Sequence, residues 1–181
     1  SQGKALLAGP VSLVIEREGR AIPAEIRDGF HLLVASNEQV SFEGTYETSE
    51  YGFQLSGRLD FDGTLLYDLI AQPKGEHGDK ALPEISRVYL SMSVKPEHAR
   101  YWFTTAGGWS PAYGEVPNEP SDVPFWTSKG FANLLPYFCF SDDDRGLHWF
   151  ADHAHEWILG DDWPFAQVVR KPDAAELQIN L

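Results

Sequence analysis

The stretch FSDDDRGLHWFADHAHEW, residues 140–157, gathers side chains that could do chemistry within one short span. It includes Asp142, Asp143 and Asp144, three hard oxygen ligands of the kind that hold calcium in loops. The calcium-loop spacing of Asp-x-Asp-x-Asp-Gly with a later glutamate is absent. We therefore predict a solvated hairpin turn, in which one carboxylate caps backbone amides and another pairs with Arg145. The three aspartates are kept as calcium candidates only.

Three histidines follow the aspartates and raise the question of a zinc site. His148, His153 and His155 lie near Asp152 and Glu156. Zinc is commonly bound by two histidines on one face together with a third ligand, and HExxH is the helical form of that arrangement. That motif is absent, and His153 and His155 share a face only on a strand, so we predict no metal site here.

A reaction centre in this stretch is a further alternative. Glycoside hydrolysis needs two carboxyl groups roughly 5 to 10 Å apart, and any acid-rich domain can supply such a pair. The nucleophile motif GxSxG and the glycine-rich phosphate motifs are missing from the chain. We therefore predict no catalytic residue in this chain.

An aromatic loop is the better binding candidate. Residues 105–130 read TAGGWSPAYGEVPNEPSDVPFWTSKG, in which prolines and glycines exclude a long helix or a central strand. Trp109, Tyr113 and Trp126 stand there among acidic and amide residues, which offers flat stacking surfaces beside hydrogen-bond acceptors. The rings suit recognition of polyols; alternatively, they fold over the core or dock onto a neighbouring domain.

Composition excludes several classes of partner. The 181 residues carry 27 acidic and 14 basic side chains, a net charge of −13, so nucleic acid and anionic membrane surfaces are disfavoured. No apolar run approaches the ~20 residues of a membrane helix. The single cysteine, Cys139, allows no intrachain disulfide and lies in the apolar run LLPYFCF.

The elements that must position these residues read as strands. Residues 51–60, YGFQLSGRLD, alternate apolar and polar side chains, and Asp62-Gly63 is a strong hairpin signal before a return strand over residues 64–71. Gly44 interrupts the strand predicted over residues 40–48 and suggests a bulge. The best helical candidate, residues 151–159, is short. We predict one all-β domain over residues 1–181, an antiparallel β-sandwich of about ten strands.

The stretch LLPYFCFSDDDRGLHWFADHAHEW resembles a signature of large bacterial glycoside-hydrolase-like proteins, in which a β-sandwich domain of uncharacterised function precedes a (β/α)-barrel. The shared pattern is Pro-Tyr, a short strand, a turn, Arg-Gly-Leu, an aromatic pair, an acid and a later Trp. The matching residues are Pro136, Tyr137, Asp143, Arg145, Gly146, Leu147, Trp149, Phe150, Asp152 and Trp157. The resemblance implies a domain of a larger extracellular or periplasmic protein, with a galactose-mutarotase-like or carbohydrate-binding-module-like sandwich.

Our first hypothesis is a non-catalytic accessory domain that binds or presents carbohydrate, without a cofactor unless calcium binds. Its partners would be carbohydrate and a neighbouring domain of the same polypeptide. The first alternative is a purely structural sandwich that packs against a catalytic barrel. The second is a self-contained glycan hydrolase or lyase that uses Asp152 with His148 or His153. The predicted ligand-binding residues are Trp109, Tyr113, Trp126, Asp144, Arg145, Trp149 and Asp152.

Overall fold

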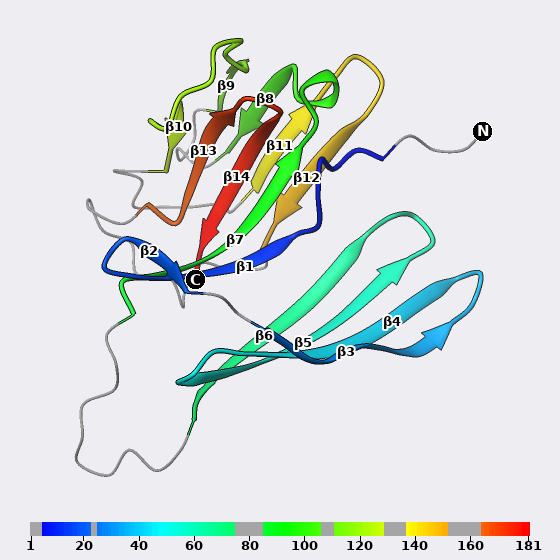
Figure 1. Cartoon of the computed structure of the whole chain (residues 1–181). Helices are drawn as coiled ribbons and strands as arrows, with labels where there is room; N and C mark the ends of the chain where they lie inside the picture. The colour runs from blue at the N-terminus through cyan, green and yellow to red at the C-terminus, as the bar shows by residue number, and fades with distance from the viewer. Residues whose placement is uncertain (1–4, 23–24, 75–84, 106–110, 129–136, 152–163) are drawn as a thin grey trace. The chain divides into compact units, whose positions relative to one another are not determined.

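The computed structural model of the protein describes residues 5–22, 25–74, 85–105, 111–128, 137–151 and 164–181. Within these residues the chain is all-β, as predicted, with antiparallel sheets and one short 3-10 turn, η1 (Pro96–His98) (Figure 1). No helix in this part of the chain is long and apolar enough to cross a membrane. The strands are β1 (Ser12–Arg17), β2 (Arg20–Ile22), β3 (Glu25–Ala35), β4 (Gln39–Glu47), β5 (Tyr51–Asp60), β6 (Leu65–Pro73), β7 (Arg87–Val94), β8 (Tyr101–Thr104), β9 (Ala112–Glu115), β10 (Trp126–Thr127), β11 (Tyr137–Ser141), β12 (Gly146–Phe150), β13 (Ala166–Lys171) and β14 (Ala174–Asn180).

The chain divides into two compact units. Unit 1 comprises Ser1–Val14 and Arg87–Leu181, and unit 2 comprises Ile15–Ser86. The boundary falls inside β1, whose last three residues pair with β2 in unit 2. A single domain over residues 1–181 stays a prediction, and each unit is described by itself below.

Unit 1 is a β-sandwich. One sheet has the order β10-β13-β14-β7-β1, and the other has the order β12-β11-β8-β9 (Figure 1). Rings from the two sheets meet: the centroid of Trp126 on β10 lies 6.1 Å from that of Trp102 on β8 and 5.2 Å from that of Phe138 on β11. Trp149 on β12 stacks with Phe165, just before β13, at 6.1 Å. Such aromatic pairs add roughly 0.5–1.5 kcal/mol each beyond the area they bury.

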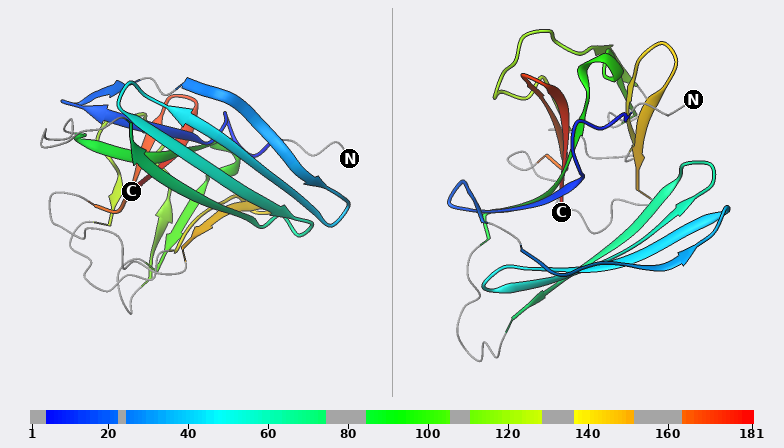
Figure 2. Two further views of the ribbon diagram at one scale, coloured as in Figure 1. Left: turned by 90° about the horizontal axis from the view of Figure 1, so that it is seen from below. Right: turned by 45° about the vertical axis from the view of Figure 1, so that its right-hand side comes forward.

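Unit 2 contains the four long strands β3-β4-β5-β6 in sequential antiparallel order, drawn as a twisted sheet in Figure 2. The Asp62-Gly63 turn between β5 and β6 is confirmed, since Gly63 has a φ of 88° and the Asp62 carboxylate accepts a hydrogen bond from the Thr64 amide at 2.9 Å. The irregularity predicted at Gly44 lies on its partner strand. The register between β3 and β4 shifts between Ile26 and Phe30, and Phe30 is the residue paired with Gly44. A Cβ at Gly44 would lie 3.0 Å from the Phe30 ring.

Most of the predicted strands form, with one difference in the second half of the chain. The loop predicted over residues 105–130 contains the short strands β9 and β10, both at sheet edges, where proline and glycine are tolerated. The helix candidate over residues 151–159 lies outside the described residues, apart from Ala151.

Candidate functional site

The Asp turn between β11 and β12 is held by one carboxylate. Asp142 Oδ1 accepts hydrogen bonds from the backbone amides of Asp144 at 2.7 Å and Arg145 at 2.8 Å, which confirms the predicted cap. Its Oδ2 lies 2.7 Å from Nδ1 of the buried His98. The hydrogen bond from His98, followed by those of the two amides, lowers the pKa of Asp142 to about 2. Asp142 therefore has a structural role in this turn.

The remaining charges of the turn are paired differently from our prediction. Arg145 Nε lies 3.7 Å from the same Asp142 carboxylate, not from a second one. Arg100, just before β8, pairs with Asp143 at 3.0 Å, and its guanidinium lies 4.9 Å from the Tyr101 ring centroid. In the described part of the chain, no group of three or more His, Cys, Asp or Glu residues is placed to hold a metal ion. Calcium binding by the three aspartates stays a prediction from the sequence.

Two of the predicted stacking rings face the interior of unit 1. Trp126 and Trp149 are each 8% exposed. Tyr113, by contrast, is 76% exposed on β9. Trp109 and Asp152 lie outside the described residues, so nothing is said of their positions. Asp144 and Arg145 are exposed in the turn.

The outward side of the sheet β12-β11-β8-β9, which we name the outer face, carries the exposed rings. Strand alternation places neighbours on opposite faces, and the Trp102 and Phe138 rings stack together inside the sandwich. Phe103 and Tyr113 are therefore outward and directly opposite each other, 36% and 76% exposed. Phe150, next to the buried Trp149, is outward and 53% exposed.

A glycine makes this division of faces possible on the edge strand. A Cβ at Gly114 would lie 3.1 Å from the Trp102 indole nitrogen, so the residue between Tyr113 and Glu115 has to be small for that ring to sit inside. Gly146 is required for a similar reason, because a Cβ there would lie 2.3 Å from the Phe140 carbonyl oxygen.

A hydrogen-bonded cluster lies in the middle of the outer face. The Tyr137 hydroxyl lies 2.6 Å from His148 Nδ1, and His148 Nε2 lies 3.7 Å from the sulfur of Cys139. Phe103 meets the Tyr137 ring edge-on at 5.9 Å. Burial raises the pKa of both Tyr137 and Cys139, so the phenol and the thiol stay protonated at neutral pH. The cluster is suited to fixing the His148 ring rather than to nucleophilic chemistry.

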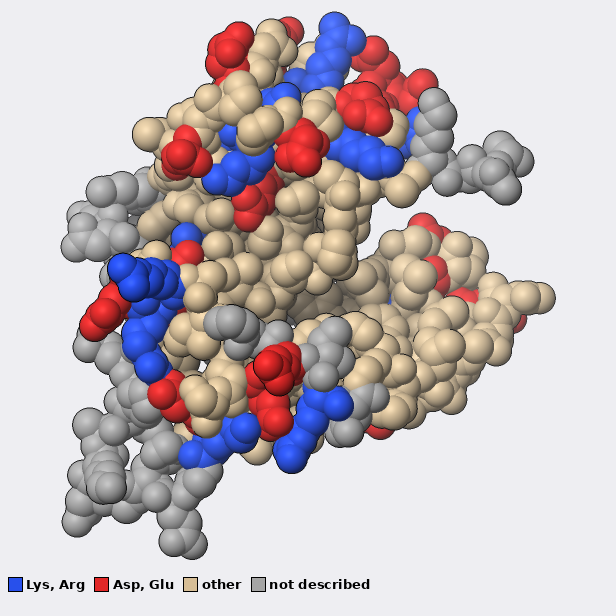
Figure 3. Space-filling view, in the orientation of Figure 1, with Lys and Arg blue, Asp and Glu red and all other residues tan. Residues whose placement is uncertain are grey.

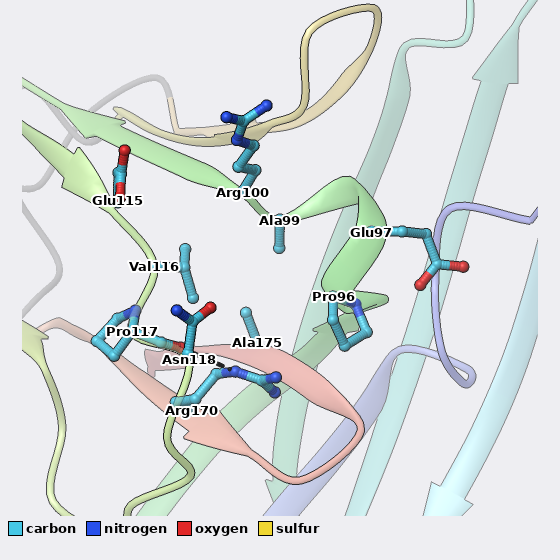
Figure 4. A pocket seen from close by; sticks show the side chains of 10 residues that line it. All are labelled: Pro96, Glu97, Ala99, Arg100, Glu115, Val116, Pro117, Asn118, Arg170 and Ala175. Carbon is cyan, nitrogen blue, oxygen red and sulfur yellow. Dashed lines mark hydrogen bonds between the residues drawn. The ribbon is translucent and has the colours of Figure 1, made fainter.

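One end of the outer face adjoins a pocket of about 340 Å³, which we name the end pocket (Figure 4). Glu115, opposite Tyr101 across β8 and β9, lines it together with Arg100, Asn118 and Arg170. Arg170 Nε and Nη1 donate to the carbonyl oxygens of Pro117 at 3.0 Å and Ala174 at 2.9 Å. Acidic and basic side chains interleave over the top of unit 1 in Figure 3.

The outer face and the end pocket together offer flat apolar rings beside charged and amide groups. That combination suits a ligand with apolar ring faces and many hydroxyl groups. Sequence reasoning missed Phe103, Tyr137 and Phe150 as outward rings, although the Trp149-Phe150 pair had to divide between two faces. The missing information was which ring of each pair meets the second sheet.

Comparisons with known proteins identify the family. A family model for the third domain of glycoside hydrolase 123 matches residues 1–115. The match includes all of unit 2 together with β7, β8 and β9 of unit 1, and ends before the residues 134–157 that carry the resemblance noted in the sequence. No curated protein and no solved structure matches the chain.

Proposed function

This chain belongs to the family of glycoside hydrolase 123 third domains, and we propose that it is a non-catalytic accessory domain that binds carbohydrate. The parent protein would be a glycoside hydrolase that meets its substrate in an extracellular or periplasmic setting. The family match supports the accessory role, and the exposed rings of the outer face support carbohydrate binding.

The exposure of Tyr113, Phe103 and Phe150 on one sheet face carries the proposal. The paired strands hold Phe103 and Tyr113 opposite each other, so a sugar can stack on them without ordering a loop first. Glu115, Asn118 and Arg100 at the end pocket would exchange hydrogen bonds with sugar hydroxyls. We expect dissociation constants of about 10 µM to 1 mM, because a shallow face desolvates few atoms.

For the Asp turn, the described contacts support the non-catalytic part of the proposal. Both oxygens of the Asp142 carboxylate are occupied, by His98 on one side and two amides on the other. A low pKa also disfavours Asp142 as a general acid, which must hold a proton near the working pH. Reducing-sugar release by the isolated chain would overturn this part of the proposal.

Calorimetric titration of the chain with soluble glycans tests carbohydrate binding. The double variant Phe103→Ala/Tyr113→Ala is expected to lose at least about tenfold in affinity, equal to ~1.4 kcal/mol. Phe61→Ala is the matched control, because Phe61 is 82% exposed in unit 2 and should leave binding unchanged. Equal affinity in the double variant and the control would assign the ligand to another surface.

A second candidate function is structural. In unit 2, one sheet face carries Phe30, Leu32, Leu59 and Leu65, each at least 41% exposed, an apolar surface of the kind that marks protein contacts. A neighbouring domain of the same polypeptide would be the partner. Aggregation of the isolated chain, relieved by adding the catalytic barrel as a separate protein, would favour this function.

A further inference from the structure

Unit 2 carries a polar row on the sheet face opposite its apolar residues. The register aligns His31 on β3 with Glu43 on β4, Glu43 with Ser56 on β5, and Ser56 with Asp68 on β6. The four residues therefore form one line across the whole sheet, perpendicular to the strands. A Cβ at Gly57 would lie 2.3 Å from the Phe42 ring, which places that ring on the other face.

This row lines a groove of about 380 Å³, which we name the polar groove. Thr45 and Gln54 extend it along the strands, and Ile70, which pairs with Gln54 on the same face, is its apolar contact. No lysine or arginine is among the described residues that line it. The groove thus offers two carboxylates, an imidazole, two hydroxyls and an amide.

Among the described residues, the carboxylates of the groove lack ion-pair partners of the kind that Arg27, Arg58 and Lys74 provide to other acids of unit 2. Within the described residues, no hydrogen bond or ion pair involves the side chains of Glu43, Ser56 or Asp68. Thr45 Oγ1 is buried and has no partner there, a cost that a ligand or water would remove. The described ion pairs of unit 2 are Arg17–Glu50, Arg27–Glu47, Lys74–Glu47 and Arg58–Asp60.

The spacing of the two acidic residues favours a ligand with more than one ammonium group. Neighbouring strands are about 4.8 Å apart, so the backbones of Glu43 and Asp68 are separated by about 10 Å. Two ammonium groups carried by one oligomer can each meet one carboxylate at this separation, whereas a single ammonium group meets both only where the two side chains converge. Ser56, between them, is placed to exchange hydrogen bonds with hydroxyl groups.

We propose that the polar groove binds a short oligosaccharide of amino sugars with free, protonated amines. Glu43 and Asp68 pair with ammonium groups, and His31, Thr45, Gln54 and Ser56 bond hydroxyls. This site is separate from the outer face of unit 1 and does not depend on it.

Calorimetric titration with glucosamine oligomers, at a pH where their amines are protonated, tests the proposal. The 181-residue chain is expected to bind them, and to bind N-acetylated oligomers of the same length at least tenfold more weakly at this site. Glu43→Gln/Asp68→Asn should weaken binding of the amine form at least tenfold. The same loss is not expected for Glu38→Gln/Glu119→Gln, which removes two charges from exposed positions outside the groove.

Two results would overturn the proposal. One is an equal loss of affinity in Glu43→Gln/Asp68→Asn and Glu38→Gln/Glu119→Gln, which would mean that overall charge alone attracts the ligand. The other is equal affinity for the amine form and the N-acetylated form. Thermal melting must first show that both double variants are folded. Phe103→Ala/Tyr113→Ala should retain the binding of the amine form, so failure of the outer face as a sugar site and failure of the polar groove give different results.

Discussion

The inner and outer faces of the sheet β12-β11-β8-β9 are both aromatic, yet they differ in what the rings meet. Phe138 and Phe140 are 1% and 0% exposed because the second sheet of unit 1 covers them. Phe103 and Phe150, each next along a strand to an inward ring, are 36% and 53% exposed. The aromatic side chains of this sheet therefore stabilise the sandwich on one face and leave exposed rings on the other.

The largest expected effect on folding stability comes from removing a buried ring from the inner face. Phe138→Ala should lower the free energy of unfolding by about 3–5 kcal/mol, because it removes a buried ring that contacts Trp102, Trp126 and Phe140. Urea denaturation measures it. Phe150→Ala, on the outer face, should cost less than about 1 kcal/mol. Similar losses in the two variants would abolish the distinction between the faces.

A smaller loss of folding stability is expected from Gly146→Ala at the start of β12. The new methyl group would lie 2.3 Å from the Phe140 carbonyl oxygen, so the backbone of the hairpin has to shift. Overpacking of this kind costs about 1–3 kcal/mol. Gly52→Ala, whose Cβ would lie 4.0 Å from the Gln72 carbonyl oxygen, is the matched control in a strand of unit 2. Denaturation curves that shift equally for both would show that the contact at Gly146 is relieved at no cost.

On the outer face, a single ring should affect binding without affecting stability. Tyr113→Ala is expected to weaken glycan affinity roughly tenfold and to change the free energy of unfolding by no more than about 0.5 kcal/mol. Val123→Ala, at a position 73% exposed in the same unit, should change neither quantity. A lower melting temperature for Tyr113→Ala would instead indicate that the ring supports the fold.

The smallest expected effect is on folding stability at acid pH, and it concerns the Asp turn between β11 and β12. The pKa of Asp142 is about 2 in the folded chain, below its ordinary value of 3.8, so its contribution to stability is present above pH 3.8. That contribution is lost as the pH falls from about 4 to 2. Denaturation measured across this range should show a shallower decline for Asp142→Asn than for the unaltered chain. Parallel curves would show that the hydrogen bonds of Asp142 do not favour its charged form.

Local sequence patterns anticipated the strands well, because alternation and turn residues act over a few positions. Asp62-Gly63 and the strand over residues 51–60 are examples, and Asp142 caps its turn as its chemistry required. Alternation alone left open which face of each strand is covered. Trp126 and Trp149 were therefore predicted as ligand contacts, although the pairing of the two sheets places them inside. The small edge strands β9 and β10 also depend on distant partners that the loop composition conceals.

Backbone amide shifts measured by NMR during a glycan titration test the central claim most directly. Shifts are expected for Phe103, Tyr113, Tyr137, His148 and Phe150, and for Glu115 at the end pocket, with little change at the inward Trp102 and Phe138. A titration that saturates while these outer-face amides stay unmoved would contradict the assignment of this surface as a carbohydrate-binding face.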